Sequence, residues 1–252
     1  IFFRCCEEMR NKVVIFVSNL AGGGAEKVMV TVANGLSSEG VEVHLVAVNA
    51  VGVNLGGLHK QVVLHDLKSQ KAVYSLWKLQ EVIQSIEPDA VLACANMPSF
   101  LVCILKLFRR IKCRVVISER AVFSITMANA PILVRVAFPL FVRLFYRYAD
   151  QIISVSDDVS KDLADNFSIP NKKIKTIYNP IIDDNISDSQ WKPKAFCGQN
   201  YIVAVGRLNP QKNYLSLLRA YASLNEDHQC RLVILGSGSE KTKIQSAINE
   251  LR

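Results

Sequence analysis

The sequence predicts an α/β protein in which helices cover both faces of a parallel sheet. Three observations support this prediction. Short runs of β-branched residues alternate with longer segments whose apolar residues have helical spacing. The runs 13–17 and 152–155 are apolar almost throughout, as expected of strands buried on both faces of a parallel sheet. Half of the 252 residues are hydrophobic and 21% are charged, so the chain can bury a large core and is not disordered as a whole.

The predicted elements alternate regularly up to about residue 180. We expect strands at 12–18, 42–48, 61–65, 90–94, 113–118, 151–155 and 174–177. We expect helices at 24–39, 71–86, 98–110, 131–148 and 157–167. In the first of these helices Ala25, Val28 and Leu36 lie on one face, and Gly40 follows at the position of a C-cap. These elements predict one doubly wound, Rossmann-like domain over residues 9–180.

A change in composition predicts a domain boundary after Pro180. Residues 181–200 are rich in Asp, Asn, Ser and Lys, which is typical of an interdomain linker. A second alternation follows, with strands at 201–205 and 230–235 and helices at 211–224 and 239–251. Residues 201–252 form about two β–α units, too few for a usual domain of roughly 100–150 residues, so we expect a C-terminally truncated second domain. Residues 1–8 precede Met9, and we interpret them as a non-native or read-through leader.

Basic residues outnumber acidic ones. With 30 Lys and Arg against 22 Asp and Glu, the formal net charge is +8, which suits an anionic partner such as nucleic acid, an acidic membrane surface or a phosphorylated substrate. No nucleic-acid-binding module is recognisable and the charge is spread along the chain, so we do not expect nucleic acid as a partner. The seven cysteines contain no Cys-x-x-Cys pair. We therefore expect reduced thiols in the cytoplasm, with neither a disulfide framework nor a metal site.

A glycine-rich loop joins the first predicted strand to the first predicted helix. Gly22, Gly23 and Gly24 allow the backbone to approach a ligand, and the free N–H groups at a helix start favour an anion. A tight turn that only packs the helix on the strand explains the same residues. Lys27 stands where the dinucleotide pattern G-x-G-x-x-G needs its last glycine, and the second strand ends at Asn49 without an acidic residue for a ribose. Hydride transfer on a dinucleotide is therefore not expected.

A second glycine turn carries two cations. Gly206 follows a predicted strand, and Arg207 and Lys212 flank the start of the next predicted helix near Pro210. Two fixed cations beside the positive end of a helix dipole form a clamp for a diphosphate. The alternative is that both are ordinary solvated surface residues.

One strand later the turn is repeated. Gly236 and Gly238 again join a strand to a helix. Turns that follow neighbouring strands of a parallel sheet lie at the same carboxyl edge, where open α/β sheets bind ligands. The two turns are therefore expected to form one site.

Several segments together resemble glycosyltransferase family 4. They are the glycine loop 22–28 (GGGAEKV), the turn 205–208 with Lys212, the turn 235–238, and the runs 117–120 (ISER) and 149–156 (ADQIISVS), which are similar to runs in bacterial members that build surface polysaccharides. The resemblance covers nearly the whole chain from about residue 12. The motifs are specific jointly, and each alone is not.

The resemblance implies a GT-B architecture of two Rossmann-like domains and a transferase that retains the anomeric configuration, without a bound metal or other cofactor. It implies a nucleotide-sugar donor, which we expect to be UDP-linked. By position, the donor diphosphate would be bound by Arg207, Lys212, Gly206, Gly22, Gly23 and Gly24, and the nucleotide side by Gly236 and Gly238. Cations fixed at the leaving phosphate would stabilise the charge that develops there in the transition state.

Two departures from the family qualify this picture. The family carries a pair of glutamates, separated by seven residues, further along the C-terminal domain, and this chain ends before such a pair. We therefore expect the fragment to be inactive alone. Many members also have a His after the fourth strand, and residues 93–99 contain none. Asn96 and Glu119 are the candidates for the acceptor side, although a helix-capping Asn and a solvated Glu are simpler explanations.

Residues 132–148 (ILVRVAFPLFVRLFYRY) predict a basic amphipathic helix. Arg135, Arg143 and Arg147 lie within about 120° of one another on it, and Pro139 is expected to kink it. Three arginines and a proline make it a poor transmembrane span. It suits an anionic membrane surface, although a domain helix whose arginines extend from an apolar face explains the same pattern.

The neighbouring segment adds cations to this helix, among them Arg109 and Arg110. Together these residues could attach a cytoplasmic protein to the inner face of the plasma membrane and attract a lipid-linked acceptor. The resulting hypothesis is a glycosyltransferase that transfers a sugar from a nucleotide-sugar donor to a lipid-linked glycan acceptor in polysaccharide biosynthesis, such as that of lipopolysaccharide or capsule. The alternative is a non-catalytic sugar-nucleotide-binding protein of the same fold.

Overall fold

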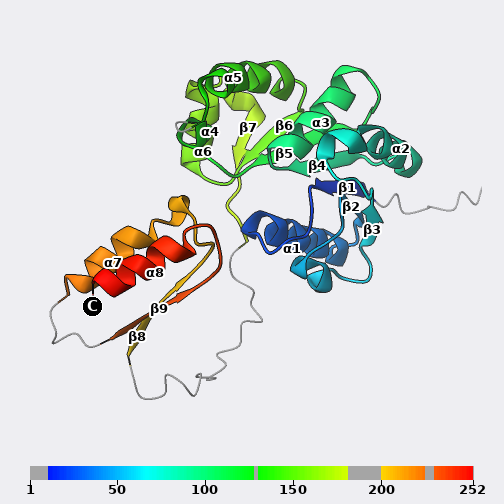
Figure 1. Ribbon diagram of the computed structural model, residues 1–252. Coiled ribbons are helices and arrows are strands. Elements are labelled where there is room, and N and C mark those ends of the chain that lie inside the picture. The colour runs from blue at the N-terminus through cyan, green and yellow to red at the C-terminus, as the bar shows by residue number, and fades with distance from the viewer. Residues whose placement is uncertain (1–10, 128–129, 181–199, 225–229, 252) are drawn as a thin grey trace, which may run out of the picture. The chain divides into compact units, whose positions relative to one another are not determined.

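The computed structural model describes residues 11–127, 130–180, 200–224 and 230–251, which belong to two compact units (Figure 1). Unit 1 spans Ile1–Asp183 and unit 2 spans Asp184–Arg252. The expected leader 1–8 and the expected linker, apart from Asn200, lie outside the described residues.

Unit 1 contains a seven-stranded parallel sheet with the order β3-β2-β1-β4-β5-β6-β7. Its strands are β1 (Lys12–Val17), β2 (Glu42–Ala47), β3 (Val63–Asp66), β4 (Ala90–Cys94), β5 (Arg114–Glu119), β6 (Gln151–Ser154) and β7 (Ile174–Thr176). Val13 of β1 pairs with Val43 of β2 on one side and with Ala90 of β4 on the other. The strand order therefore changes direction between β1 and β4, and the predicted doubly wound sheet is confirmed.

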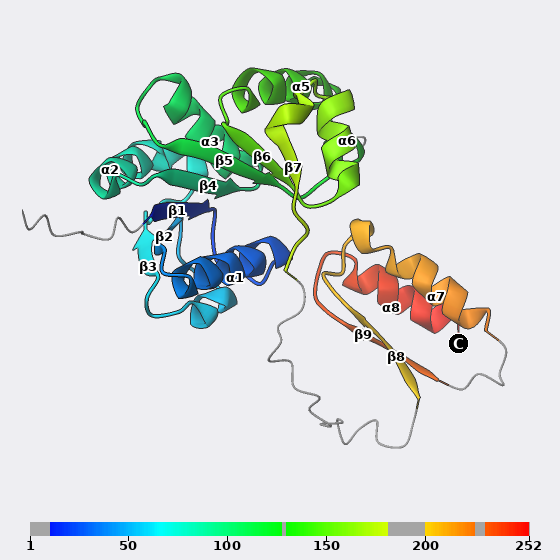
Figure 2. The same cartoon turned by 180° about the vertical axis from the view of Figure 1, so that it is seen from behind.

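Helices cover both faces of this sheet (Figure 2). On one face α1 (Gly24–Ser38) packs against Ile15 and Val17 of β1. The other face, with Val14 and Phe16, carries α2 (Leu76–Ile86), α3 (Asn96–Leu107), α5 (Ile132–Tyr146) and α6 (Asp157–Asp165). These four side chains of β1 are at most 3% exposed, which explains why the strand is apolar throughout.

Short helical turns were harder to predict than these elements. The expected helix 71–86 is divided into η2 (Ala72–Ser75) and α2, and η1 (Val53–Gly57), η3 (Asn171–Lys173) and α4 (Phe123–Met127) were not expected. The start of α4 is held by α6, because the backbone N–H groups of Phe123 and Ser124 donate to Asp162 Oδ2 at 2.7 and 3.2 Å. Such a helix depends on a distant residue rather than on its own sequence.

Unit 2 contains a parallel pair of strands, β8 (Tyr201–Val205) and β9 (Arg231–Leu235). The α-helices α7 (Tyr214–Ala222) and α8 (Lys241–Glu250) lie side by side on one face of the pair. Their core is formed by Leu208, Tyr214, Leu218 and Ile244. A 3₁₀ turn, η5 (Pro210–Lys212), precedes α7, so the α-helix begins later than the predicted residue 211.

The loop after β2 holds the glycine loop after β1 in place. The backbone N–H of Leu20 donates to Val51 O at 3.2 Å, and that of Asn54 donates to Leu20 O at 3.1 Å. The amide of Asn54 also donates to Ala21 O at 2.5 Å. Gly52, which lies between Val51 and Asn54 in the chain, has φ +140°, and a Cβ there would lie 2.1 Å from Leu20 O. Only glycine allows this close approach of the two loops.

We therefore expect Gly52→Ala to destabilise unit 1 by about 1–3 kcal/mol, because the added methyl group forces the two loops apart or strains the backbone. Urea unfolding followed by circular dichroism measures the change. Gly56→Ala is the matched control, since a Cβ at Gly56 meets no atom within 4 Å. It should stay within about 0.5 kcal/mol of the wild type, and equal unfolding midpoints for the two variants would contradict the packing argument.

Candidate functional site

The carboxyl ends of β1 and β4 meet at a small pocket in unit 1. It is lined by Val17, Ser18, Ala25, Glu26, Cys94 and Ala95. Open α/β sheets bind ligands where the strand order changes direction, and β1 and β4 flank that point. This pocket is therefore the candidate site of unit 1.

The glycine loop leaves the start of α1 open. Gly23 is the N-cap of α1, and Gly24 is its first residue. A Cβ on Gly24 would meet no atom within 4 Å, whereas one on Gly22 would lie 3.3 Å from Val53. Within the described residues, the N–H groups of Gly24, Ala25 and Glu26 donate no hydrogen bond, which suits an anion. The expectation that Gly22, Gly23 and Gly24 contact a diphosphate stays a prediction.

Backbone strain accompanies the pocket at the end of β4. Ala95 has φ 73° and ψ 165°, a region that is essentially restricted to glycine. It is the N-cap of α3, which has no side-chain cap, and Asn96 is the first residue of the helix. The interpretation of Asn96 as a helix-capping residue is therefore wrong, because the cap position falls one residue earlier. Strain of this kind clusters at functional sites.

Glu119 lies inside unit 1 rather than at its surface. The side chain is 1% exposed, and Tyr146 of α5 donates its hydroxyl hydrogen to Glu119 Oε1 at 2.6 Å. Ser99 of α3 is also buried beside this pair, and its hydroxyl forms no hydrogen bond of good geometry with a described residue. The interpretation of Glu119 as a solvated surface residue is wrong, since α5 covers it. The observed conformation does not expose its carboxyl group to a ligand.

Burial raises the pKa of Glu119 to about 7. The hydroxyl groups of Tyr146 and Ser99 and the charge of Arg120 act in the opposite direction, but they offset the loss of hydration only partly. Burial, followed by the neighbouring carboxyl group, raises the pKa of Tyr146 well above its ordinary value. Glu119 therefore changes its charge near neutral pH.

Arg120 is a site residue that the sequence analysis did not single out. It is half-buried directly after β5, its Nε donates to Cys94 Sγ at 3.1 Å, and an Nη1 hydrogen bond reaches Asn179 Oδ1 at 2.7 Å. Because Cys94 lines the pocket, Arg120 lies at its border. The available signal was a cation immediately after a predicted strand, at the edge where ligands bind.

In unit 2 the two predicted glycine turns interlock. Gly206 N–H donates to Leu235 O at 3.0 Å, and Leu208 N–H donates to Ser237 O at 2.8 Å. A Cβ on Gly236 would lie 1.8 Å from Gly206 O, and one on Gly238 would lie 2.3 Å from Leu208 O. The turns therefore form one structure at the carboxyl edge of β8 and β9, and the glycines are needed for their contact.

Arg207 and Lys212 both lie at this edge and are exposed. Lys212 Cε lies 3.6 Å from the position of a Cβ on Gly206, so the lysine stem folds over the glycine turn. Neither cation forms an ion pair with a described residue. Nearby, Asn209 Oδ1 is buried without a hydrogen-bond partner among the described residues. Binding of a diphosphate by the two cations stays a prediction.

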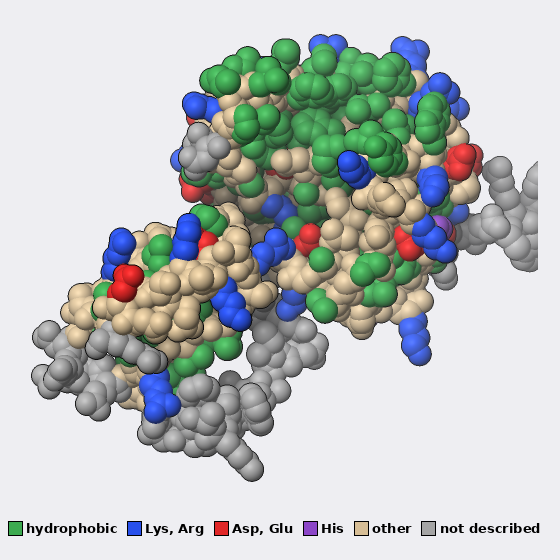
Figure 3. Space-filling view, in the orientation of Figure 1, with side chains coloured by type: hydrophobic (Ala, Val, Ile, Leu, Met, Phe, Trp, Pro, Cys, Tyr) green, Lys and Arg blue, Asp and Glu red, His purple; other side chains and the backbone are tan. Residues whose placement is uncertain are grey.

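The basic helix predicted at 131–148 is α5, and most of its apolar surface is exposed. Among its residues only Val142 and Tyr146 are buried. The exposed apolar side chains are Ile132 (72%), Leu133 (77%), Val134 (43%), Val136 (69%), Leu140 (66%), Phe141 (52%) and Leu144 (45%). They form part of the broad apolar surface in Figure 3, which we call the α5 surface. The helix continues through Pro139 as one element.

Cations border the α5 surface. Arg135 and Arg143 are exposed on α5, and Arg147 is exposed at its C-cap. Arg143 donates to Asn166 O at 3.3 Å, and the Arg147 guanidinium lies 4.9 Å from the centre of the Tyr148 ring.

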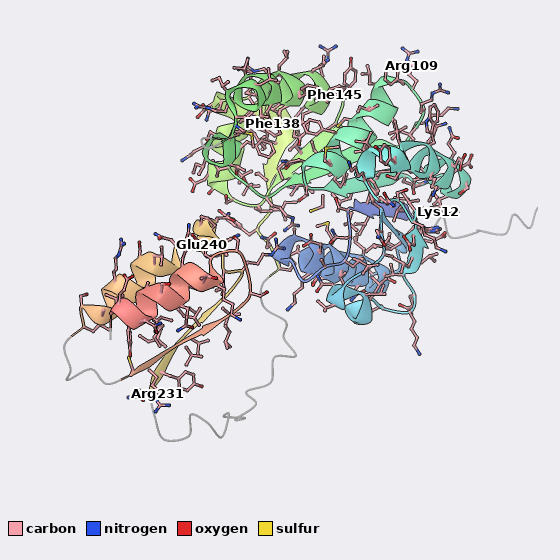
Figure 4. All side chains as sticks on the ribbon, viewed as in Figure 1. Lys12, Arg109, Phe138, Phe145, Arg231 and Glu240 are labelled. Atoms are coloured by element: carbon pink, nitrogen blue, oxygen red, sulfur yellow. The ribbon has the colours of Figure 1, made fainter. Side chains whose placement is uncertain are left out.

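Arg109 and Arg110 are exposed just after α3, which contacts both α5 and η2 (Figure 4). Tyr74 of η2 and Trp77 of α2 are 67% and 65% exposed, and the sequence analysis did not identify them. In the described part of the chain, no helix is long and apolar enough to cross a membrane, and no cluster of three or more His, Cys, Asp or Glu is placed to hold a metal ion.

We expect Glu119→Gln to change how the stability of unit 1 depends on pH. Because the pKa is about 7 in the folded protein against an ordinary 4.5, folding binds a proton between these values. This stabilisation is complete below about pH 4.5 and is lost as the pH rises through about 7. Glutamine carries no charge at any pH. Between pH 5 and pH 8, the free energy of unfolding of the variant should therefore rise relative to that of the wild type by on the order of 2–3 kcal/mol. Urea unfolding at both pH values measures the difference.

Glu81→Gln is the control, since Glu81 is exposed on α2. This variant should follow the wild type at both pH values. If the stability difference between Glu119→Gln and the wild type is the same at pH 5 and pH 8, the raised pKa of Glu119 in the folded protein is contradicted.

Two family models match the chain. Glycosyltransferase Family 4 matches residues 22–185, and Glycosyl transferases group 1 matches residues 185–252. The chain is 32% identical over 250 residues to N-acetylgalactosamine-N,N'-diacetylbacillosaminyl-diphospho-undecaprenol 4-alpha-N-acetylgalactosaminyltransferase of Campylobacter jejuni, covering 95% of this chain and 66% of that protein. It is 24% identical to the amylovoran biosynthesis glycosyltransferase AmsD of Erwinia amylovora, with the same shares covered. The chain thus spans slightly less than two thirds of the length of these relatives.

Solved structures of glycosyltransferases share the fold. A glycosyltransferase from Rickettsia africae matches with a TM-score of 0.69 and 16% identity, covering 96% of this chain and 66% of that one. HepE from Anabaena, solved with UDP and glucose, matches with a TM-score of 0.69 and 17% identity, covering 96% and 65%. These likenesses confirm the predicted α/β fold class of GT-B type. The family model covers more than half of the chain, which therefore belongs to glycosyltransferase family 4.

Proposed function

We propose that the protein transfers a sugar from a UDP-linked donor to a lipid-linked glycan acceptor in polysaccharide biosynthesis, with retention of the anomeric configuration. The observation that carries this proposal is the pair of interlocked glycine turns of unit 2, which leave Arg207 and Lys212 free of ion pairs with described residues. The name of the Campylobacter relative supports a lipid-linked acceptor, that of the Erwinia relative supports polysaccharide biosynthesis, and HepE, solved with UDP and glucose, supports the donor class.

The turns provide what a diphosphate needs. Glycines at 236 and 238 let the two turns pack on each other, since a Cβ there would collide with the backbone of Gly206 and Leu208, and this packing holds Arg207 and Lys212 at one edge of the strand pair. When the bond between the sugar C1 and the diphosphate oxygen breaks, negative charge grows on the leaving phosphate. Arg207 and Lys212 would stabilise this charge, and the acceptor hydroxyl oxygen would form the new bond to C1 as its proton passes to a base. Two fixed cations can take the part that a metal ion plays in other enzymes, so we propose that none is required.

Unit 1 provides the features for the acceptor. The apolar and basic α5 surface suits an anionic membrane, because apolar side chains enter the boundary of the lipid tails while arginines contact phosphates. The exposure of the apolar face favours this explanation over a helix that is packed within the domain. We therefore propose a cytoplasmic enzyme bound peripherally to the inner face of the plasma membrane, where a lipid-linked acceptor is available.

Arg207→Ala and Lys212→Ala should each weaken UDP binding by ~1.5–3 kcal/mol, the usual range for hydrogen bonds to charged groups. This corresponds to a loss of affinity of roughly ten- to 150-fold. Isothermal titration calorimetry with the full-length protein measures it, with and without EDTA. Arg219→Ala, an exposed change on α7, serves as the control. Unchanged UDP affinity in both clamp variants would refute the clamp, and its loss with EDTA would refute the metal-independent site.

Replacing Arg143 and Arg147 together by Glu should weaken binding to anionic liposomes. Each basic residue near an anionic surface contributes about 1 kcal/mol, so the double change should lower partitioning by at least roughly thirtyfold. Co-sedimentation with vesicles that contain anionic lipid, and with vesicles that contain none, compares the variants. The charge-matched control is Arg219→Glu with Arg231→Glu in unit 2, both exposed. Binding that is insensitive to anionic lipid and to the α5 change would contradict membrane attachment through α5.

A further inference from the structure

The pocket at the carboxyl ends of β1 and β4 combines apolar walls with two polar side chains that have no protein partner. Val17, Ala25 and Ala95 form apolar walls, while Ser18 and Glu26 supply a hydroxyl and a carboxyl group. Both polar side chains are half-buried, and neither forms a hydrogen bond or an ion pair with a described residue. Apolar walls with a few polar groups are typical of a site for a small molecule.

Helix capping does not explain Glu26. It is the third residue of α1, a position from which a glutamate can accept a hydrogen bond from the N–H of the N-cap residue. Here the N–H of the N-cap, Gly23, donates to Ala21 O at 2.8 Å instead, and α1 has no side-chain cap. The carboxylate still interacts favourably with the positive end of the helix dipole, but its oxygens remain free to accept hydrogen bonds from a ligand.

Arg120 brings a positive charge to the same pocket. Its Nε donates to Cys94 Sγ and its Nη1 to Asn179 Oδ1, which fixes the guanidinium, while its Nη2 donates to no described residue. Burial raises the pKa of Cys94, the charge of Arg120 lowers it, and the charge of Glu26 raises it. The guanidinium and the carboxylate thus both lie near this thiol. They form no ion pair with each other, so each can bind a ligand.

The two charges decide which class of ligand suits the pocket. One carboxylate and one guanidinium cancel, and a diphosphate inside the pocket would meet the negative charge of Glu26. A neutral sugar fits better, because its hydroxyl groups donate to a carboxylate and accept from a guanidinium or a serine hydroxyl. The predicted diphosphate contact is then left to Gly22 and Gly24, which are exposed and do not line the pocket.

We propose that this pocket is a sugar-binding subsite, in which the Glu26 carboxylate accepts a hydrogen bond from a sugar hydroxyl and Ser18 and Arg120 bind the same sugar. The inference rests on the proposed function, which supplies two sugars, that of the donor and that of the acceptor glycan. The chemistry recognised is the same for both, and the test separates them. All residues of the pocket belong to unit 1, so the subsite does not depend on the position of unit 2.

The test uses the full-length protein and two probes. The donor is UDP-N-acetylgalactosamine, and the acceptor is N-acetylgalactosamine-N,N'-diacetylbacillosaminyl-diphospho-undecaprenol, from the name of the Campylobacter relative. Glu26→Ala should either raise KM for the acceptor or weaken binding of the UDP-sugar by roughly ten- to 100-fold, since a hydrogen bond to a charged group is lost. Binding of UDP itself, measured by calorimetry, should stay unchanged.

Two milder variants test the same contact. Glu26→Gln keeps a neutral acceptor oxygen, so it should change the same constant by only roughly three- to tenfold. Ser18→Ala removes a neutral hydroxyl outside the helix and should change it by roughly two- to tenfold. A change in acceptor KM alone assigns the subsite to the acceptor glycan. A loss of affinity for UDP-N-acetylgalactosamine without a loss for UDP assigns it to the donor sugar.

Glu39→Ala is the matched control, because Glu39 is exposed at the other end of the same helix. It should change none of these constants. If Glu26→Ala lowers only the midpoint of urea unfolding, Glu26 serves the helix dipole, and if it tightens UDP binding, the carboxylate faces the diphosphate. Either result overturns the proposal. A wild-type protein that binds no UDP and transfers no sugar refutes the proposed function and the subsite together, whereas normal transfer that is indifferent to Glu26 and Ser18 refutes only the subsite.

Discussion

The parallel pairing of β1 with β2 on one side and β4 on the other decides where the candidate site lies. Parallel strands end at a common edge, so the loops that follow β1, β2 and β4 must meet there. The loop after β2 closes on the glycine loop through Gly52, and the strained Ala95 follows β4. Arg120 extends the same edge at the end of β5. The strand order thus determines where the pocket lies, and the side chains determine only its lining.

Unit 2 uses the same physical device on a smaller scale. In both units, glycine permits one backbone segment to approach another more closely than any side chain allows, and the result is two loops in contact at a carboxyl edge. The approach is closest at Gly236, where a Cβ would lie 1.8 Å from Gly206 O. The glycine pattern of the sequence therefore located both turns, whereas the binding of a diphosphate there stays a prediction.

The sequence was sufficient for features that depend on neighbouring residues. Strand β8 was expected at 201–205 and is Tyr201–Val205, because its apolar β-branched run is bounded by polar residues. Features that depend on distant partners could not be predicted. The first N–H of the short helix α4, that of Phe123, donates to the carboxylate of Asp162, which lies 39 residues further along the chain. Glu119 is buried because Tyr146, which lies 27 residues further along the chain, covers it. A single sequence gives no signal for such contacts, and an acid at the end of a strand is usually solvated.

The burial of Glu119 and the exposure of the apolar residues of α5 are related. α5 exposes most of its apolar residues, so hydrophobic burial alone would allow it to rotate about its axis and turn them inward. Its inner side is fixed by Val142 and by Phe138 and Phe145, whose rings contact Phe123 and Phe100. The two aromatic pairs meet edge to face, and the hydrogen bond from Tyr146 to Glu119 adds a further directional contact that belongs to one rotation of the helix. A buried carboxyl group reduces stability, and here that reduction is accompanied by an orientation that keeps the apolar and basic surface of α5 facing outward.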